Sequence, residues 1–285
     1  MMISNLITIS DTHCGCQLGL CPSKIRMAHG GFYEASRFQL SMLHKWNYFW
    51  QKWVPKVTRS EPFAVLLNGD MLDGRHHYST HQVSQDKSDQ ANIAYEMLSP
   101  VVDSCEGRFY YVSGTSAHAG EAGEDEERLA ERLGAIPDET GRRSRYELFI
   151  QVGKCLVHAS HHIGITGSMA YETTALTKEY NEICAESARW GRQIPDIVVR
   201  SHRHRHSEVR VPTVRGYGII YVTSAWQLKT PFAYRIPGGR VTTPSVGGSL
   251  IRSGDEEYYT RHYTIETERA KTEQIPEGCH DYTCV

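Results

Sequence analysis

The 285-residue sequence contains no apolar run of membrane-spanning length and no apolar N-terminal segment typical of a signal peptide. Its net charge of −2 is too small to predict a general electrostatic attraction to nucleic acid. Internal repeats and low-complexity segments are also absent. Eight cysteines in a chain of this length do not indicate a disulfide scaffold. We therefore expect a cytoplasmic protein without a membrane partner, and its oligomeric state is left open.

The composition is typical of a folded protein with a sizeable core, since 40% of the residues are hydrophobic. We expect a single domain over residues 1–270. Its motifs lie within residues 3–206, and residues 207–270 are expected to complete it with β structure. Residues 271–285 are expected to form a flexible C-terminal tail.

Strand and helix patterns alternate through the first two hundred residues, which predicts an α/β (α+β) fold. Apolar spacing predicts helices at 35–54, 86–102, 124–133 and 171–190. In the first helix, an apolar stripe is expected to pack in the core: Phe38, Met42, Trp46, Phe49 and Trp53. Pro55 is expected to end that helix. After residue 205 the chain is predicted to be mainly β, with the clearest strands at 218–223 and 257–265.

Side chains that can bind metal ions follow five short apolar runs, at 6–9, 64–67, 109–112, 155–157 and 197–199. The clusters are Asp11 with His13, Asp70 with Asp73, His118, His161 with His162, and His202 with His204. In sheets with buried parallel strands, ligands collect beyond the carboxyl ends of the strands. We therefore expect these distant residues to meet in one site.

The residue types in these clusters indicate the chemistry of the site. Aspartate and histidine bind divalent ions of borderline hardness, unlike the thiolates of structural zinc sites. Two ions about 3.5–4 Å apart need a shared carboxylate, and together they activate water and neutralise phosphoryl oxygens. Asp70 is the natural bridge. We predict two divalent metal ions, with Mn²⁺ as first choice and Fe²⁺, Zn²⁺, Ni²⁺ or Mg²⁺ as alternatives.

Single motifs also have simpler explanations. A strand-end aspartate can cap a turn, and a lone histidine can be structural. The spacing of Cys14, Cys16 and Cys21 would allow a thiolate site, but a fourth ligand is missing and reduced thiols are the simpler interpretation. Three histidines after Asp73 are expected to lie in a surface loop: His76, His77 and His81.

The order of the motifs resembles that of the calcineurin-like metallophosphoesterase superfamily. D-x-H, G-D-x-x-D, a glycine-containing loop with a histidine, a histidine pair and x-H-x-H follow one another over residues 3–206. The segment from Gly114 to His118 and the pair after Ser160 resemble those of uncharacterised phage and prophage members. The resemblance implies a four-layer fold in which helices flank a β-sandwich.

The resemblance also implies roles for single residues. Asp11, His13 and His204 would bind the first metal ion, Asp70 would bridge, and His161 and His202 would bind the second. His118 would take the position of the catalytic histidine. Asp73 would orient His118 and raise its pKa.

Three positions in the implied site are left open. Thr115 stands where the family has a metal-binding asparagine, so the second ion could be weakly held, a water could replace the donor, or His118 could itself bind metal. His158 is an alternative to His161 as a ligand. His162 is expected to lie behind the ligands or to face the substrate.

Arginines alternate with histidines from Arg200 to His206 and continue to Arg210 and Arg215. Guanidinium groups pair well with phosphate oxygens, so Arg203 and Arg205 are candidates for substrate binding. The alternative is that these side chains point away from the site and only solvate a face.

Three functions fit the sequence. The first is metal-dependent hydrolysis of phosphodiesters, with DNA or RNA as candidate substrates. The second is a phosphomonoesterase, including a phosphoprotein phosphatase. Such phosphatases carry Asp-Arg-Gly after the bridging motif, whereas this chain has Asp73-Gly74-Arg75. The third is a binding or scaffold protein that keeps the fold without the chemistry.

Overall fold

The computed structural model describes residues 3–76, 78–164, 168–214, 216–236, 239–254, 257–267 and 272–274. The tail expected at 271–285 lies outside the described residues, apart from 272–274. His77 and Arg215 also lie outside them. Across the described residues, no helix is both long enough and apolar enough to cross a bilayer.

Two β-sheets form the centre of the structure. The first has the strand order β13-β12-β1-β4-β5-β6 and the second the order β10-β11-β9-β8-β7. The strands of the first sheet are β1 (Asn5–Ile9), β4 (Ala64–Asn68), β5 (Phe109–Val112), β6 (Ser144–Arg145), β12 (Ser245–Ser253) and β13 (Tyr258–Glu266). The second contains β7 (Leu148–Val152), β8 (Cys155–Ala159), β9 (Ile197–Arg200), β10 (Ser207–Thr213) and β11 (Gly216–Val222). The last four strands are therefore shared equally between the two sheets.

Most of the strands that precede the predicted ligands pair in parallel with their neighbours. β1, β4, β5 and β6 run parallel in the first sheet, and β8, β9 and β11 run parallel in the second. The loops after β1, β4, β5, β8 and β9 therefore leave the sheets at carboxyl ends, as the sequence pattern predicts.

In the described residues, six α-helices, one π-helical turn and one 3-10 turn surround the sheets. The helices are α1 (Arg37–Tyr48), α2 (Val54–Thr58), α3 (Lys87–Ser104), α4 (Ser116–Ala119), α5 (Glu124–Arg132) and α6 (Glu172–Arg189). The π-helical turn η1 (Phe49–Trp53) joins α1 to α2, and the 3-10 turn η2 (Met169–Tyr171) precedes α6. A small hairpin, β2 (Lys24–Arg26) with β3 (Phe32–Glu34), completes the described elements.

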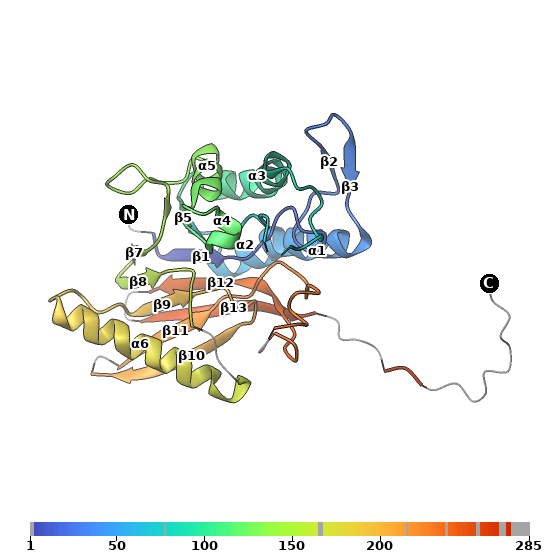
Figure 1. Cartoon of the computed structure of the whole chain (residues 1–285). Helices are drawn as coiled ribbons and strands as arrows, with labels where there is room; N and C mark the ends of the chain where they lie inside the picture. Colours follow the sequence, from blue (N-terminus) through green and yellow to red (C-terminus); the bar gives the residue numbers. More distant parts are fainter. Residues whose placement is uncertain are drawn as a thin grey trace.

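Alternating side chains of the strands divide the interior into three hydrophobic cores. Ile7 belongs to the core under α1, α3 and α5, whereas the adjacent Leu6 belongs to the core between the two sheets. In the second sheet, Val199 faces the core between the sheets and Val198 packs toward Tyr180 of α6. The layers are thus helices, sheet, sheet and helix (Figure 1). This confirms the four-layer arrangement of a β-sandwich flanked by helices.

The predicted helices agree with the structure except in the first. Ser36 caps α1 through a reciprocal hydrogen-bond pair with Gln39, so the start is well specified. Pro55 does not end the helix, because it lies in the first turn of α2, where the missing N–H costs no intrahelical hydrogen bond. Phe38 was expected in the core but is 48% exposed. It lies beside the guanidinium group of Arg37.

Candidate metal centre

The loops after the parallel strands bring the predicted ligands together between the two sheets. Five of the six predicted metal ligands have a left-handed backbone, with φ between 43° and 74°: Asp11, His13, Asp70, His202 and His204. Non-glycine residues rarely adopt this conformation unless the surrounding structure requires it. Backbone hydrogen bonds hold two of these residues in this conformation: Asp11 N–H donates to the Gly69 carbonyl, and His13 N–H donates to the Asp70 carbonyl.

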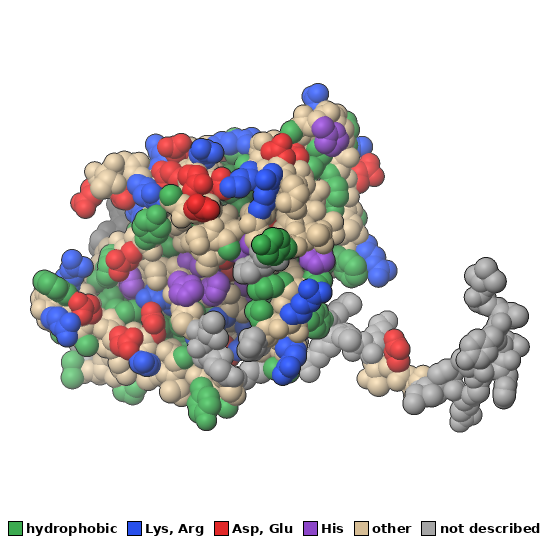
Figure 2. Space-filling view, in the orientation of Figure 1, with side chains coloured by type: hydrophobic (Ala, Val, Ile, Leu, Met, Phe, Trp, Pro, Cys, Tyr) green, Lys and Arg blue, Asp and Glu red, His purple; other side chains and the backbone are tan. Residues whose placement is uncertain are grey.

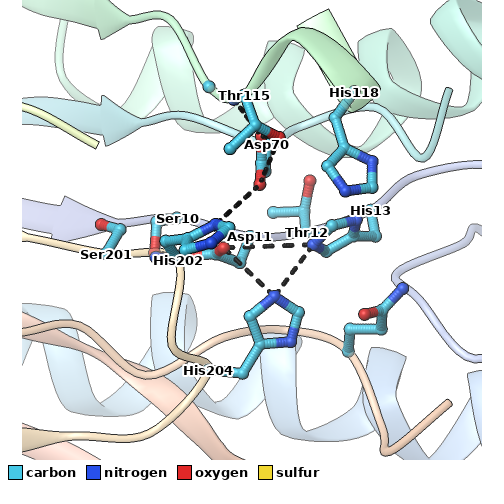
Figure 3. A network of polar contacts seen from close by, with 12 residues as sticks. Ser10, Asp11, Thr12, His13, Asp70, Thr115, His118, Ser201, His202 and His204 are labelled. Carbon is cyan, nitrogen blue, oxygen red and sulfur yellow. Dashed lines mark hydrogen bonds and ion pairs between the residues drawn. The ribbon is translucent and has the colours of Figure 1, made fainter. Parts of the chain in front are cut away.

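Asp11, His13 and His204 form the first ligand group (Figure 3). His204 Nε2 lies 3.2 Å from Asp11 Oδ1 and 3.1 Å from His13 Nε2. His13 Nε2 lies 4.0 Å from Asp11 Oδ1. Donors bound about 2.1 Å from one tetrahedral ion lie roughly 3.4 Å apart, so the three atoms have the spacing of a metal site.

Asp70, His161 and His202 form the second ligand group. Asp70 Oδ2 lies 3.0 Å from His161 Nε2 and 4.0 Å from His202 Nδ1. The other ring nitrogen of His161, Nδ1, lies 2.6 Å from the Asn68 carbonyl. A carbonyl only accepts, so Nδ1 carries a proton and Nε2 is directed at the carboxylate. Asp70 also belongs to a group with His13 and His118, which places it between the two ligand groups.

The ionised aspartates of this centre favour the binding of cations. Burial alone would raise the pKa of Asp11 and of Asp70, but neighbouring histidines lower both, through His204 for Asp11 and His161 for Asp70. Burial alone would lower the pKa of His161, but the charge of Asp70 raises it to about 10. In the absence of metal, a proton on His161 therefore compensates the buried carboxylate.

Unsatisfied atoms support the same interpretation. Asp11 Oδ1 and His161 Nε2 are buried and have no partner with hydrogen-bond geometry among the described residues. Each nevertheless lies 3.0–3.2 Å from a ligand atom of its own group. Buried polar atoms are nearly always hydrogen-bonded unless an ion satisfies them. The residues of both groups therefore fit divalent metal ions.

A chain of polar side chains links the two ligand groups behind the centre. Ser10 Oγ donates to Asp11 and lies 2.5 Å from Thr223 Oγ1. Thr223 Oγ1 donates to Ser201 Oγ at 2.8 Å, and Asn68 Nδ2 donates to the same atom at 2.6 Å. Because the Asn68 carbonyl holds His161, this chain couples the orientation of a ligand in one group to that in the other.

Glu126, on α5, is a structural partner of the centre that the sequence pattern did not indicate. Its two oxygens accept the backbone N–H groups of Met71 and Gly114, at 2.7 and 2.6 Å. These residues adjoin Asp70 and Thr115. Burial raises the pKa of Glu126 to about 7, with a further contribution from Asp70. The sequence shows only one acid among several at a helix start, so its role required the tertiary structure.

Thr115 supports Asp70 and stands where the superfamily that the sequence resembles has asparagine. Its backbone N–H donates to Asp70 Oδ1 at 2.7 Å, and its hydroxyl lies 3.2 Å from the same oxygen. Gly114 is required beside it, because a Cβ there would lie 2.0 Å from Asp70 Oδ1. Thr115 thus orients the carboxylate that the sequence predicts to bridge two ions.

Asp73 contacts His118 differently from the expectation. His118 Nδ1 donates to the backbone carbonyl of Asp73 at 2.5 Å, whereas the Asp73 carboxylate lies 3.5 Å from His13 Nδ1 and 3.7 Å from His76 Nε2. The expectation that this carboxylate orients His118 was wrong, because the left-handed turn at Gly74 directs the main chain toward His118. The carboxylate instead faces the first ligand group.

His118 is half-buried and neutral in this environment. Burial lowers its pKa to about 4, against the opposing charge of Asp70. Since Nδ1 carries the proton, Nε2 is an acceptor at neutral pH. His76, expected in a surface loop, instead lies with its ring centroid 4.5 Å from that of His118 and forms a ligand group with Asp73 and His118.

Several candidate residues lie outside the centre. His158 contacts Glu147 at 2.8 Å and stacks on Phe149, and it belongs to none of the ligand groups. His162 is exposed, with its ring 4.8 Å from that of His202. The cysteines of the 14–21 segment are buried, and burial raises their pKa values to about 12, which disfavours a thiolate site.

The two arginines proposed to bind phosphate differ from each other. Arg205 is paired with Glu172, at 2.8 Å, and does not line the cavity of the centre. This contradicts its expected role, because a neighbouring carboxylate already neutralises it. Arg203 lines the cavity and donates to the Gly164 carbonyl, and two of its nitrogens have no hydrogen-bond partner among the described residues.

A cavity of about 590 Å³ opens beside both ligand groups. His13, Asp70, His118 and His202 line one side of it. In the surface view, histidine side chains gather near the middle of the face, between the α5 half and the α6 half (Figure 2). The centre can therefore be reached by a small molecule from outside.

No protein-family model matches the chain, and no curated protein matches it. Among solved structures, vacuolar protein sorting 29 from Cryptosporidium parvum is 12% identical, with a TM-score of 0.39 over 94% of this chain and 100% of that one. Vacuolar protein sorting 29 from Entamoeba histolytica, solved with Zn²⁺, is 10% identical, with a TM-score of 0.40 over 92% and 98%. The sulfate thiohydrolase SoxB from Thermus thermophilus is 11% identical, with a TM-score of 0.38 over 93% of this chain and 57% of SoxB. Similarities of this size do not define a function, which has to be argued from the site.

Metal binding should release a proton from His161. Its pKa of about 10 keeps it charged at pH 7, and a metal ion at Nε2 replaces that proton, so metal affinity should rise with pH up to about 10. Calorimetry in two buffers of different ionisation enthalpy measures the proton count. His161→Gln should release about one proton fewer than the wild type. His162→Gln serves as the control, because His162 is exposed and belongs to none of the ligand groups. Equal proton counts in wild type and His161→Gln would contradict the assignment.

Glu126→Ala should weaken metal binding by roughly 10–100-fold, as for other groups that position ligands. Glu127→Ala is a matched control, because Glu127 also accepts two backbone N–H groups, from Arg143 and Ser144, away from the ligand loops. Both changes should reduce the free energy of unfolding by about 1–3 kcal/mol. Competition with a chelating dye and urea unfolding separate the two effects. Equal losses of metal affinity in the two variants would show that Glu126 is only structural.

Proposed function

We propose that the chain is a metal-dependent phosphoesterase that hydrolyses phosphodiester bonds with two divalent ions, Mn²⁺ being the first to test. One observation carries this proposal: two Asp/His ligand groups, linked by a further group of Asp70, His13 and His118, open into one cavity. Asp11, His13 and His204 would hold one ion, and His161 and His202 the other. Asp70 would contact both.

The bound ions would supply a nucleophile from water at neutral pH and would neutralise the phosphoryl oxygens. The side chains of this chain have separate tasks. Arg203 borders the cavity, but its Nε and Nη1 are buried without a partner among the described residues and its Nη2 donates to the Gly164 carbonyl, so its guanidinium group would have to turn to donate to a phosphoryl oxygen. His118 presents Nε2 to the same cavity, where a bound phosphate anion would favour its protonation and allow it to donate to the leaving oxygen.

The distribution of cations favours a diester over a monoester. A monoester carries more negative charge, and phosphatases of the resembled family grip it with the arginine of Asp-Arg-Gly. Here Arg75 is exposed, donates to the Gln85 carbonyl and does not line the cavity. Among the described residues, Arg203 is the only arginine that does. A monoesterase therefore remains the second candidate.

The sequence predicts nucleic acid as a candidate substrate. The arginines between Arg200 and Arg210 give this prediction little support. Arg200 is buried and paired with Glu179, Arg205 is paired with Glu172, and Arg210 lies 3.5 Å from Glu208. These pairs leave little free positive charge beside the centre for a polyanionic backbone. The resemblance to phage members and the cytoplasmic location remain predictions, as does the choice of Mn²⁺.

Hydrolysis of bis-nitrophenyl phosphate by chelator-stripped protein, reloaded with Mn²⁺, tests the proposed activity. Wild type should turn over the diester faster than nitrophenyl phosphate. Asp70→Asn should bind both ions weakly and lose turnover, since this carboxylate lies between the two ligand groups. Labelled single- and double-stranded DNA and RNA are tested in parallel. Two bound ions per chain without turnover of any diester would overturn the proposal and favour a monoesterase or a scaffold.

His118→Ala should retain both metal ions but lower turnover by roughly 10²–10⁴-fold, as expected for loss of a general acid. Metal content is measured by atomic emission, and turnover with the nitrophenyl diester. His44→Ala, an exposed histidine on α1, is the control and should change neither quantity. Loss of an ion from His118→Ala would instead assign His118 as a ligand, which its group with His13 and Asp70 also allows.

A further inference from the structure

The cavity beside the metal centre is larger than a phosphoryl group needs. Its volume of about 590 Å³ is in the range that holds a whole small organic ligand. Polar ligands and histidines line one side. The opposite side is a wall formed by described residues within 227–236 and 239–244, between β11 and β12, which the sequence analysis did not single out.

The exposed lining of the cavity is mainly apolar, although five polar side chains also belong to the wall: Gln227, Lys229, Thr230, Thr242 and Thr243. The apolar side chains of the wall are Leu228, Phe232, Ala233, Ile236 and Pro244. The first four are only half-buried, so they present apolar surface to the cavity instead of filling a core. Lys229 is the only lysine among the described lining residues, and its amine already donates to the Arg240 carbonyl at 2.7 Å. Such a surface favours an uncharged organic group over a second phosphate.

The wall is attached to the ligand loops through the backbone. Trp226 N–H donates to the Asp11 carbonyl at 2.9 Å, and Leu228 N–H donates to the Leu18 carbonyl at 2.9 Å. At its other end, Ser245 N–H donates to the His204 carbonyl at 2.9 Å. The apolar surface and the first ligand group therefore keep a fixed spacing, as a binding site for two parts of one molecule requires.

Aromatic rings connect the wall to the reacting end of the cavity. The ring of His118 lies 4.5 Å from that of His76, and the ring of His76 lies 6.4 Å from that of Phe232, at 82°. An organic group bonded to the oxygen that faces His118 would extend along His76 to Phe232. Rings near a right angle to each other offer an edge and a face to a planar guest.

We propose that this wall binds the leaving alcohol of the substrate, and that this alcohol carries a planar aromatic group. The inference rests on the proposed phosphodiesterase function and narrows its substrates to small aryl or heteroaryl phosphate esters. In the reaction, the bond between phosphorus and the aryl-bearing oxygen breaks. A water oxygen forms the new bond to phosphorus, one proton of that water ends on the leaving alcohol, and the other ends on the phosphate monoester that forms or is released to solvent.

Two diesters with the same methyl group test the inference: methyl phenyl phosphate and methyl 2-naphthyl phosphate. Phenol and 2-naphthol are similarly acidic, so the intrinsic cleavage of the two esters is similar. Burial of the added ring should give wild type a roughly tenfold higher kcat/KM for the naphthyl ester. Phe232→Ala should reduce this ratio to about two or less, and Phe232→Leu should be intermediate.

The control is Phe32→Ala, because Phe32 is 63% exposed on β3 and is not part of the cavity wall. It should keep the wild-type ratio. A ratio near one in wild type, a ratio unchanged in Phe232→Ala, or faster turnover of single-stranded DNA than of either ester would overturn the inference while leaving the phosphodiesterase function intact.

A binding measurement separates failure of the inference from failure of the proposed function. Methylphosphonate and (2-naphthylmethyl)phosphonate have carbon–phosphorus bonds that are not hydrolysed, and calorimetry gives their Kd values for the Mn²⁺-loaded protein. The naphthyl compound should bind roughly tenfold more tightly to wild type but not to Phe232→Ala. Absence of diester turnover with this difference intact would refute only the activity. Equal Kd values would refute the aromatic site.

Discussion

The burial of carboxylate charge between the two sheets is the constraint on which the rest of the structure depends. Asp11, Asp70 and Asp73 are each at most 1% exposed. Charges of one sign cannot be removed from water at such density without compensation, because the desolvation penalty of each is several kcal/mol. Histidines supply part of that compensation, and the charge on His161 is the clearest case. Divalent ions would supply more, since each carries two positive charges where the histidine carries one.

The fold serves this constraint by directing backbone groups as well as side chains at the carboxylates. Asp70 accepts the backbone N–H of Thr115, and Glu126 holds the backbone of the two loops on either side of it. Left-handed turns at five ligands and close glycine contacts allow the loops to approach one another. Each of these conformations is costly in isolation and persists because the hydrogen-bond network behind the centre holds it. The arrangement is therefore preorganised for cations in a way that a flexible loop cluster would not be.

The two sides of the cavity suit different parts of a substrate. The ligand side, with Arg203 at its border, suits the phosphoryl group, and the apolar wall around Phe232 suits the organic part of an ester. Arg200, Arg205 and Arg210 are each paired with a glutamate, so little positive charge is available to a substrate beyond the centre itself. Apolar contact rather than long-range electrostatic attraction is then the main source of selectivity available to this site.

Much of the fold could be predicted because local patterns report local structure. Continuous apolar runs indicated β1, β4 and β9, and apolar spacing indicated α3 and α5. The position of ligands after parallel strands was enough to expect their convergence, because carboxyl ends of neighbouring strands share an edge. Pro55 and Phe38 were misjudged, since a proline in a first helical turn and a half-exposed aromatic have the same local sequence as a stop and a core residue.

By itself, the sequence determined which residues could bind cations and at which strand ends they stand. Only the tertiary structure decided which atom of Asp73 meets His118, that Glu126 clamps two loops, that Arg205 is neutralised by Glu172, and that an apolar wall faces the ligands. The physical reason is range. Periodicity and capping act over a few residues, whereas these hydrogen bonds and this ion pair join residues 33 to 55 positions apart and depend on how the chain packs.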